Sequence, residues 1–279
     1  MLTISSLFIY PIKSLGGISL TSSQITSRGL LYDRRWMLIN DDNKFISQRE
    51  YPQMALCKTE LVPDGIKVVF KHNDDILIPF DAPAIGRAEV TIWDDTCTAD
   101  IVCLEAAEWF SKVLGVNCRL VYMPEDSRRP VDPEYAPDDK INSFSDGYPC
   151  LLIGEASLTD LSERCGEIIL MDRFRPNIVF TGGAPYAEDE MAHFKINNID
   201  FYGVKICARC PIPGIDQETA ARTKEPLKTL ARYRKKNNKI YMGQNLIHTG
   251  EGTLNIGDVL HILSTKPATV FNEEVGEVR

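Results

Sequence analysis

The sequence predicts a mainly β protein with a few helices, of the β-barrel type of α+β fold. Short segments rich in β-branched and aromatic residues succeed one another through the first hundred residues, and Gly, Pro, Asp or Asn interrupts them. Helical periodicity occurs in three segments, and no internal repeat is present. The chain has 279 residues, of which 44% are hydrophobic. This length suffices for a buried core in one large or two moderate domains.

The pattern of the first hundred residues indicates an antiparallel β-barrel or sandwich. A helix follows over 104–115, with Gly115 as a suitable terminator. Its apolar residues share one helical face: Ala107, Phe110, Val113 and Leu114. The strands expected before this helix cover residues 2–10, 17–26, 34–40, 54–62, 66–71, 88–93 and 97–103.

A loop or linker is expected over 123–140, which contains four prolines and many charges without periodicity. A domain boundary should therefore fall within 110–140. We expect an N-terminal β-barrel domain over 1–120, a second domain over 121–265 and a tail over 266–279.

The second half mixes strands with two helices. One helix is expected over 157–165, which opens with a Ser-x-x-Asp start signal, and the other over 225–236, which has Pro at an early position. The expected strands cover residues 174–180, 199–208, 239–249 and 258–264.

The charge balance disfavours two classes of partner. The net charge is −8 and the pI is about 5.2, whereas binding to nucleic acid or to an anionic membrane depends on a basic surface. The basic run 232–239 is interpreted as a solvated helix end. No apolar run reaches the length of a membrane-spanning helix, and the first residues lack the features of a secretory signal, so a cytoplasmic protein is expected.

The segment CARCPIPGID places Cys207 and Cys210 three positions apart. A zinc site lacks further ligands at a suitable spacing, and a thioredoxin-type pair should open a helix, whereas two prolines follow here. A third interpretation is a single thiolate on a rim loop that leaves a strand, bound to a soft or high-valent metal with Arg209 nearby. The alternative is a buried cysteine beside an exposed one. The other six cysteines are interpreted as small apolar residues.

Three short segments offer groups that suit an anion. Lys13 and Ser14 lie in an expected turn with two glycines, which provides a charge, a hydroxyl and backbone N–H groups, although a solvated hairpin turn is the simpler interpretation. At 34–35 two arginines open a strand, so alternation should turn at most one of them inward. Arg175 and Asn177 are expected on one face of another strand. An inward arginine needs an anion or a carboxylate partner.

Taken in order, the motifs resemble those of the MOSC family, named for the C-terminal domain of molybdenum cofactor sulfurases. The branch with an N-terminal β-barrel domain is the most similar, and it includes the mitochondrial amidoxime-reducing component and bacterial reductases of N-hydroxylated compounds. The matching stretches run from residue 9 to about 263: YPIKS, GLLYDRRWMLIN, FISQREYPQM, FSDGYPCLLIGEASLTDL, FRPNIVFTGG, CARC, EPLKTLARYR, GQNLI and IGDVLHIL.

The resemblance implies a molybdenum cofactor, a metal carried by a pterin that bears a phosphate. In the family the second cysteine of the C-x-R-C motif is the metal ligand, which here is Cys210, whereas Cys207 is not a ligand. Phosphate and pterin contacts carried over by matching motif fall on Lys13, Ser14, Arg34, Arg175 and Asn177, with Asp146 lining the same cavity.

The implied activity is the reduction of N-hydroxylated compounds such as hydroxylamines, amidoximes and N-hydroxylated base analogues. Oxygen is removed from an N–OH group with two electrons and two protons, and no side chain is assigned as general acid. A separate flavoprotein reductase or ferredoxin is expected to supply the electrons, because no cysteine follows Cys210 to hold an iron–sulfur cluster. The alternative is a cofactor-binding or sulfur-carrier protein without turnover, and a third possibility is thiol redox chemistry by Cys207 and Cys210.

The sequence departs from the family pattern after CARC. Many relatives have an Asp and then Thr-Gly in the loop that follows. Asp216 is present here, but the glycine position holds Ala220, which leaves the conformation of that loop open.

Overall fold

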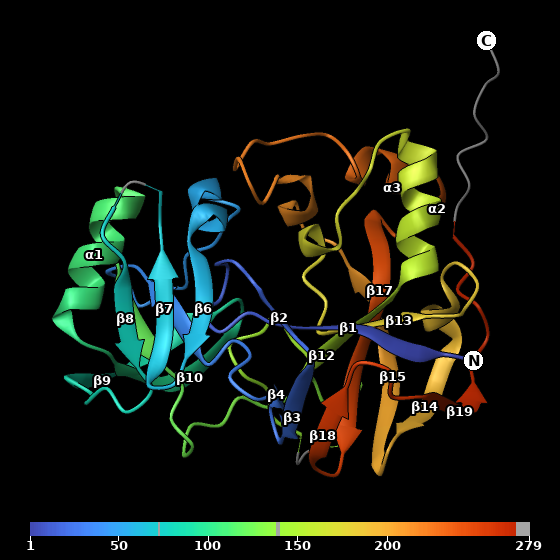
Figure 1. Ribbon diagram of the computed structural model, residues 1–279, viewed down its shortest axis with the longest axis horizontal. Coiled ribbons are helices and arrows are strands. Elements are labelled where there is room, and N and C mark those ends of the chain that lie inside the picture. The colour runs from blue at the N-terminus through green and yellow to red at the C-terminus, as the bar shows by residue number, and fades with distance from the viewer. Residues whose placement is uncertain (72, 138–139, 272–279) are drawn as a thin grey trace.

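The protein is mainly β, as expected, and the part of the chain that the structure describes has three α-helices at the periphery of its sheets (Figure 1). The computed structural model describes residues 1–71, 73–137 and 140–271. In these residues the strands form four sheets, and two groups of elements lie side by side in Figure 1, β6–β10 with α1 on one side and β12–β19 with α2 and α3 on the other.

The first group contains two antiparallel sheets and one helix. α1, Leu104–Leu114, ends at Gly115 with a left-handed φ of 67°, as predicted. Its buried face contains Ala106 rather than Ala107, together with Phe110 and Leu114. The strands of the two sheets, in spatial order, are β5 (Trp36–Ile39), β11 (Arg119–Tyr122), β10 (Asp95–Ile101) and β9 (Gly86–Ile92), then β6 (Lys58–Val62), β7 (Gly65–Val69) and β8 (Ile76–Pro79).

The second group is built on a nine-stranded sheet. β12 and β13 are parallel, and the other pairs in this sheet are antiparallel. In spatial order its strands are β19 (Leu260–Thr265), β14 (Met191–Ile196), β15 (Ile199–Ala208), β17 (Lys239–Thr249), β12 (Cys150–Gly154), β13 (Ile178–Thr181), β1 (Thr3–Ile9) and β2 (Ile18–Leu20), with β16 (Lys235–Lys236) paired to β17. A small sheet of β18 (Gly252–Asn255), β3 (Ser22–Thr26) and β4 (Gly29–Leu30) adjoins it.

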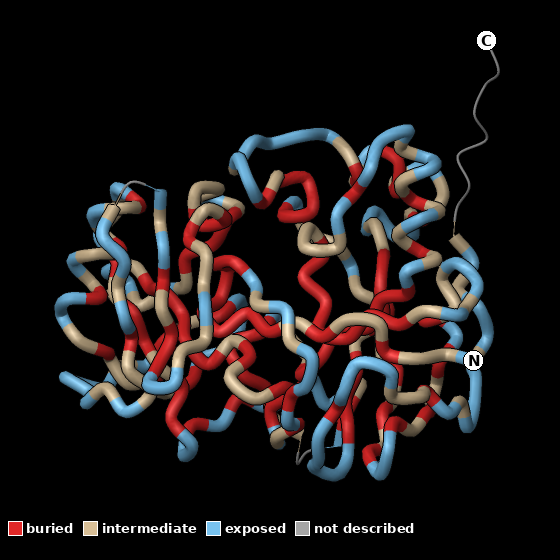
Figure 2. The backbone as a smooth tube through the Cα atoms, viewed as in Figure 1, coloured by how far each residue is buried: buried red, intermediate tan, exposed pale blue. Residues whose placement is uncertain are grey.

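The N-terminal strand belongs to the sheet of the second group. β1 pairs with β13, and the chain then crosses to the first group at Ile12, which forms a bridge with Trp36. Figure 2 shows buried backbone running through both groups and through this crossing. The crossing brings residues 10–16 between the two groups. The division at residue 120 stays a prediction.

Several helices and strands have bounds that differ from the predicted ones. Met54–Leu56 belong to a 3-10 helix, Pro52–Leu56, and the strand begins only at Lys58. α2 is Glu155–Cys165, so Ser157 lies inside the helix, where its hydroxyl donates to Glu188 instead of capping. In α3, Leu227–Tyr233, the helix stops before the predicted end, and 235–240 form a hairpin.

The basic run 232–239 is a solvated helix end only in part, because Arg232 and residues 236–239 are exposed but the helix ends at Tyr233. Arg234 is buried, and its Nη2 lies 2.6 Å from an Asp189 carboxylate oxygen. Lys235 and Lys236 form the edge strand of the hairpin, whose turn residues Asn237 and Asn238 take left-handed φ angles. Asparagine tolerates this conformation better than most residues. Between Met123 and Lys140, no strand or helix is formed in the described residues, which agrees with the predicted loop.

Candidate functional site

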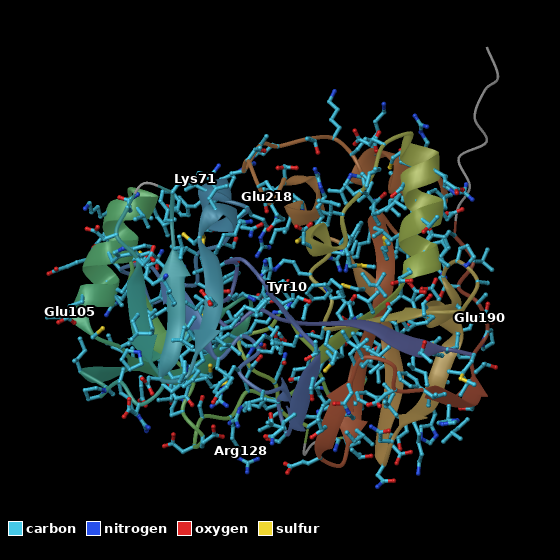
Figure 3. The ribbon with its side chains drawn as sticks, in the orientation of Figure 1. Tyr10, Lys71, Glu105, Arg128, Glu190 and Glu218 are labelled. Carbon is cyan, nitrogen blue, oxygen red and sulfur yellow. The ribbon has the colours of Figure 1, made fainter. Side chains whose placement is uncertain are left out.

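One pocket between the two groups of elements brings together all the residues that the sequence singled out as site candidates. Its volume is about 100 Å³. Lys13 and Ser14 come from the crossing after β1, Arg175 and Asn177 from the segment before β13, and Cys210 from the loop after β15. Figure 3 places Tyr10, at the start of the crossing, between the two groups. The full lining is Lys13, Ser14, Arg34, Arg49, Ser145, Asp146, Gly147, Tyr148, Cys150, Leu151, Phe174, Arg175, Asn177, Cys207, Arg209, Cys210, Ile212 and Asn245.

Lys13 is a buried cation at the pocket wall. Its Nζ donates to the Phe144 carbonyl at 2.8 Å and to Asp146 Oδ1 at 2.6 Å. Burial lowers the pKa of the Lys13 ammonium to about 8, although the Asp146 carboxylate opposes this effect. Desolvation at the pocket wall acts to raise the pKa of Asp146, although its side chain keeps contact with solvent, but Lys13 outweighs this effect and holds that pKa well below its usual range. The pair is therefore ionised at neutral pH.

Arg34 is fixed by a buried carboxylate behind the pocket. Asp33 is 1% exposed and accepts bonds from the Tyr10 backbone N–H at 2.8 Å and from Arg34 Nη1 at 2.6 Å. The same Nη1 donates to Asn177 Oδ1 at 3.2 Å, and Nη2 donates to the Arg175 carbonyl at 3.0 Å. Burial acts to lower the pKa of Arg34, but Asp33 outweighs it and the net change is upward. Arg34 is thus a permanent charge held in one orientation.

Arg175 is also buried, but with a free donor. Its Nη1 donates to the Leu15 carbonyl at 2.7 Å, while Nη2 has no protein partner. The guanidinium groups of Arg175 and Arg34 lie 4.1 and 4.2 Å from the centroid of the Tyr10 ring, a cation–π arrangement. Burial and the neighbouring Arg34 lower the pKa of Arg175 to about 10, so it remains charged at neutral pH.

The backbone at these anchors is unusual. Ser14, Arg34 and Arg175 have left-handed φ angles of 68°, 48° and 56°. Residues without a glycine's freedom adopt this conformation rarely, and such outliers gather at binding sites. Gly17 is required nearby, because a Cβ there would lie 2.4 Å from the Tyr10 ring.

The left-handed turns explain why two sequence expectations are wrong. Arg34 precedes β5, so strand alternation does not apply, and its neighbour Arg35 is buried as well. Arg35 points to another carboxylate, with Nη2 2.6 Å from Glu125 Oε1. Arg175 and Asn177 precede β13 rather than sharing a strand face, although both reach the pocket.

The two cysteines of the C-x-R-C motif differ in setting. Cys207 lies within β15, whereas Cys210 follows the end of the strand and precedes a 3-10 turn, Ile212–Gly214. Both thiols are free and half-buried. Arg209 Nη1 lies 3.1 Å from the sulfur of Cys207, so the arginine expected beside the metal thiolate contacts the other cysteine. Burial raises the pKa of the Cys207 thiol, and Arg209 only partly offsets this effect.

Several further lining residues were not among the candidates, and four of them are Arg49, Cys150, Phe174 and Asn245. Each falls within one of the stretches that carry the family resemblance, so the motifs themselves were the available signal. Nothing about Arg49 or Asn245 alone marks them, because they join the pocket only through the packing of distant segments.

The donor set suits an anion combined with a soft metal. Among the lining residues only Asp146 is acidic. Five lining residues are cationic: Lys13, Arg34, Arg49, Arg175 and Arg209. The unpartnered Arg175 Nη2 is a donor that a phosphate oxygen can satisfy. Among the described residues, no three His, Cys, Asp or Glu side chains converge to hold a metal, so a metal bound by Cys210 would need its other ligands from a bound group.

The pocket as it stands has room for a compact group such as a phosphate. An intact pterin needs more space than about 100 Å³. Within that space Lys13 and Arg175 lie with Cys210, and the side chain of Asp146 is exposed to solvent. The residues present therefore fit the phosphate and the metal-binding thiolate of such a cofactor.

Fold and site together define a mainly β protein with a cationic, thiol-containing pocket at the junction of two groups of sheets. Comparison with family models agrees with this class. Residues 1–117 match the MOSC N-terminal beta barrel domain, and residues 139–261 match the MOSC domain. The chain therefore belongs to the MOSC family.

Two kinds of curated relative are similar over most of this chain. Mitochondrial amidoxime-reducing component 1 from Mus musculus is 31% identical over 285 residues, covering 94% of this chain and 82% of the relative. Molybdenum cofactor sulfurase from Danio rerio is 30% identical over 278 residues, covering 88% of this chain but 32% of that longer protein. Within the described residues, none of the helices has the length and apolar character needed to cross a membrane.

Proposed function

We propose that this chain binds a molybdenum cofactor in the pocket and reduces N-hydroxylated compounds. The observation that carries the proposal is the meeting of Cys210 with Lys13, Arg34 and Arg175 in a single pocket, because a thiolate and an anion site are both needed to hold such a cofactor. The similarity to the amidoxime-reducing component supports the reaction class.

In this proposal each residue has a defined task. Cys210 supplies a thiolate to the metal, and Lys13, Ser14, Arg34 and Arg175 hold the phosphate and pterin. Asn177 positions Arg34, because its amide oxygen accepts from that guanidinium and from the Leu151 backbone N–H. The bound group would supply the two-electron chemistry that breaks the N–O bond.

The proposed reaction converts R–NH–OH, two electrons and two protons into R–NH₂ and water. The N–O bond breaks and the nitrogen is reduced. A separate redox protein, such as a flavoprotein reductase or a ferredoxin, supplies the electrons. The two-domain division at residue 120 is part of the same proposal, with the MOSC domain proper over 121–265 and a tail over 266–279.

A second candidate is a cofactor-binding or sulfur-carrier protein without turnover. It is favoured by the similarity to molybdenum cofactor sulfurase, because the anchoring residues serve either role. Turnover decides between the two: a fully metallated protein that reduces neither a hydroxylamine nor an amidoxime with an artificial electron donor is a carrier.

The test of the site compares Cys210→Ser with Cys207→Ser as a matched control. Protein expressed with added molybdate in a cofactor-competent host is analysed for molybdenum and pterin. The proposal expects near-stoichiometric metal in wild type and Cys207→Ser, and a clear loss in Cys210→Ser. Equal losses in both variants would instead favour a dithiol function, and a folded wild type without metal or pterin would refute the cofactor.

A further inference from the structure

The inference starts from a tryptophan that contacts Asp146 beside the pocket. Trp93 is the first of two residues in the turn between β9 and β10. Its side chain is prominent on the surface, with the residue 45% exposed, and its φ is 58°. A bulky residue in left-handed conformation is a true outlier, since glycine or asparagine is preferred there.

Three contacts nevertheless hold the Trp93 ring in place. The guanidinium of Arg49 lies 3.8 Å from its centroid, and the Phe45 ring meets it edge-on at 5.2 Å. The indole N–H donates to Asp146 Oδ1 at 3.3 Å. An aromatic surface that is exposed and yet already fixed loses little conformational entropy when a ligand packs on it.

These residues form a wall between two hollows. Arg49 lines the pocket that contains Cys210, and Lys13 Nζ of that pocket lies 5.2 Å from the Phe45 centroid. On the other side is a second hollow of about 430 Å³, a size usual for small-molecule sites. It is lined by Asn40, Lys44, Phe45, Ile46, Glu50, Tyr51, Thr91 and Trp93. We call Phe45, Arg49 and Trp93 the rim cluster.

We propose that the rim cluster and the second hollow bind the organic part of the substrate, and that they select flat, conjugated N-hydroxylated compounds. This inference rests on the proposed function. An aryl or heteroaryl group stacks on Trp93 or packs against Phe45 while its N–OH group reaches toward Cys210. A small aliphatic substrate reaches the pocket without contacting the rim cluster, so the rim cluster adds nothing to its binding affinity.

The kinetic test compares benzamidoxime with acetamidoxime in the metallated protein. Trp93→Ala is expected to raise the KM for benzamidoxime about tenfold, because one aromatic contact is lost. The KM for acetamidoxime should stay within about twofold of the wild-type value. Trp93→Phe retains a ring and should stay within about threefold of wild type for both. Trp109→Phe is the matched control, because Trp109 lies on α1 and donates to the Asp74 carbonyl away from the pocket. Equal losses for both substrates, or none for either, would overturn the inference.

A binding measurement separates this inference from the proposed function. Calorimetric titration of the purified protein with each amidoxime requires no turnover. Preferential binding of benzamidoxime that Trp93→Ala abolishes and Trp109→Phe retains would support the subsite even if neither compound is reduced. Equal binding of the two compounds, or no binding of either, would refute the subsite whether or not the protein proves to be a reductase.

Discussion

The Lys13 ammonium lies 2.6 Å from the Asp146 carboxylate, and this pair joins the crossing after β1 to the loop before β12 at the pocket wall. The two side chains differ in burial, since the Lys13 side chain is 6% exposed and that of Asp146 is 61% exposed. The lysine is therefore the fixed member of the pair. The aspartate is the member that keeps contact with solvent.

The first prediction follows from the pKa of Lys13, which is about 8. Below that pH the ammonium is charged and attracts an anion, and above it the charge is lost. Retention of the phosphate-bearing cofactor during dialysis should therefore fall as pH rises through about 8. Asp146 favours the charged lysine, so Asp146→Asn should move the fall to lower pH. Lys13→Arg, which stays charged, is the control and should show no such fall. A flat profile in wild type would contradict this role of Lys13.

The second prediction concerns Arg175, whose buried guanidinium has one protein partner and a free Nη2. Arg175→Met should reduce the cofactor content more than tenfold, because the free donor and its charge are lost. The free energy of unfolding should fall by no more than about 1 kcal/mol, since one hydrogen bond is lost while a desolvated charge beside Arg34 is removed.

Cofactor analysis and urea unfolding of the cofactor-free protein measure the two effects separately. Arg175→Lys retains the charge without the fork of donors, and intermediate cofactor content is expected for it. If the free energy of unfolding of Arg175→Met were far below that of wild type, the main role of Arg175 would be to stabilise the fold rather than to bind the cofactor.

Much of the fold and the site was predictable from local pattern. β15 and β17 have the predicted bounds, because β-branched and aromatic residues and clear breakers define them. The turn at Lys13 and Ser14 and the exit of Cys210 from a strand were also predictable, since proline and glycine mark both places.

What local pattern missed depends on contacts between distant segments. Arg34 takes a left-handed φ because Asp33, paired to the Tyr10 backbone, fixes its side chain. Arg35 is buried against Glu125, ninety residues away, and no window around it contains that partner. Arg49 likewise lines the pocket because of contacts with residues distant in sequence, such as Trp93. Pairing of this kind is set by tertiary packing, which outweighs strand alternation.

The third prediction concerns Glu188, a buried carboxyl in the 3-10 turn Ala187–Glu190. Burial, with the neighbouring Asp189, raises its pKa to about 7. Between pH 4.5, the ordinary pKa of a glutamate, and about pH 7, Glu188 keeps its proton in the folded state and releases it in the unfolded state. Glu188 therefore contributes stability that is full below 4.5 and is lost as pH rises through about 7.

Glu188→Gln lacks this titration and still offers an oxygen to the Ser157 hydroxyl. Its free energy of unfolding, relative to wild type, should rise by up to about 3 kcal/mol from pH 4.5 to pH 8. Urea unfolding at several pH values measures the difference, in which other titrating groups cancel. A constant difference across this range would mean that Glu188 has an ordinary pKa.

The last prediction concerns Ala220, the position where the family resemblance leads us to expect glycine. The loop is ordered by Asp216, whose Oδ1 accepts from the backbone N–H of Thr219 at 2.9 Å and whose carbonyl accepts from the N–H of Ala220 at 2.8 Å. This closure gives Ala220 a φ of 59°. Alanine is strained in that conformation, whereas glycine adopts it freely.

Ala220→Gly should therefore stabilise the protein by about 0.5–1 kcal/mol, despite the greater entropy of a glycine in the unfolded chain. The matched control is Ala221→Gly, because the adjacent residue does not have a left-handed φ. That variant should lose about 0.5–1 kcal/mol, since it gains the entropic cost without relieving strain. Urea unfolding of the three proteins compares them directly. If both glycine variants lost stability equally, Ala220 would not be strained in solution, and the loop would close by another arrangement.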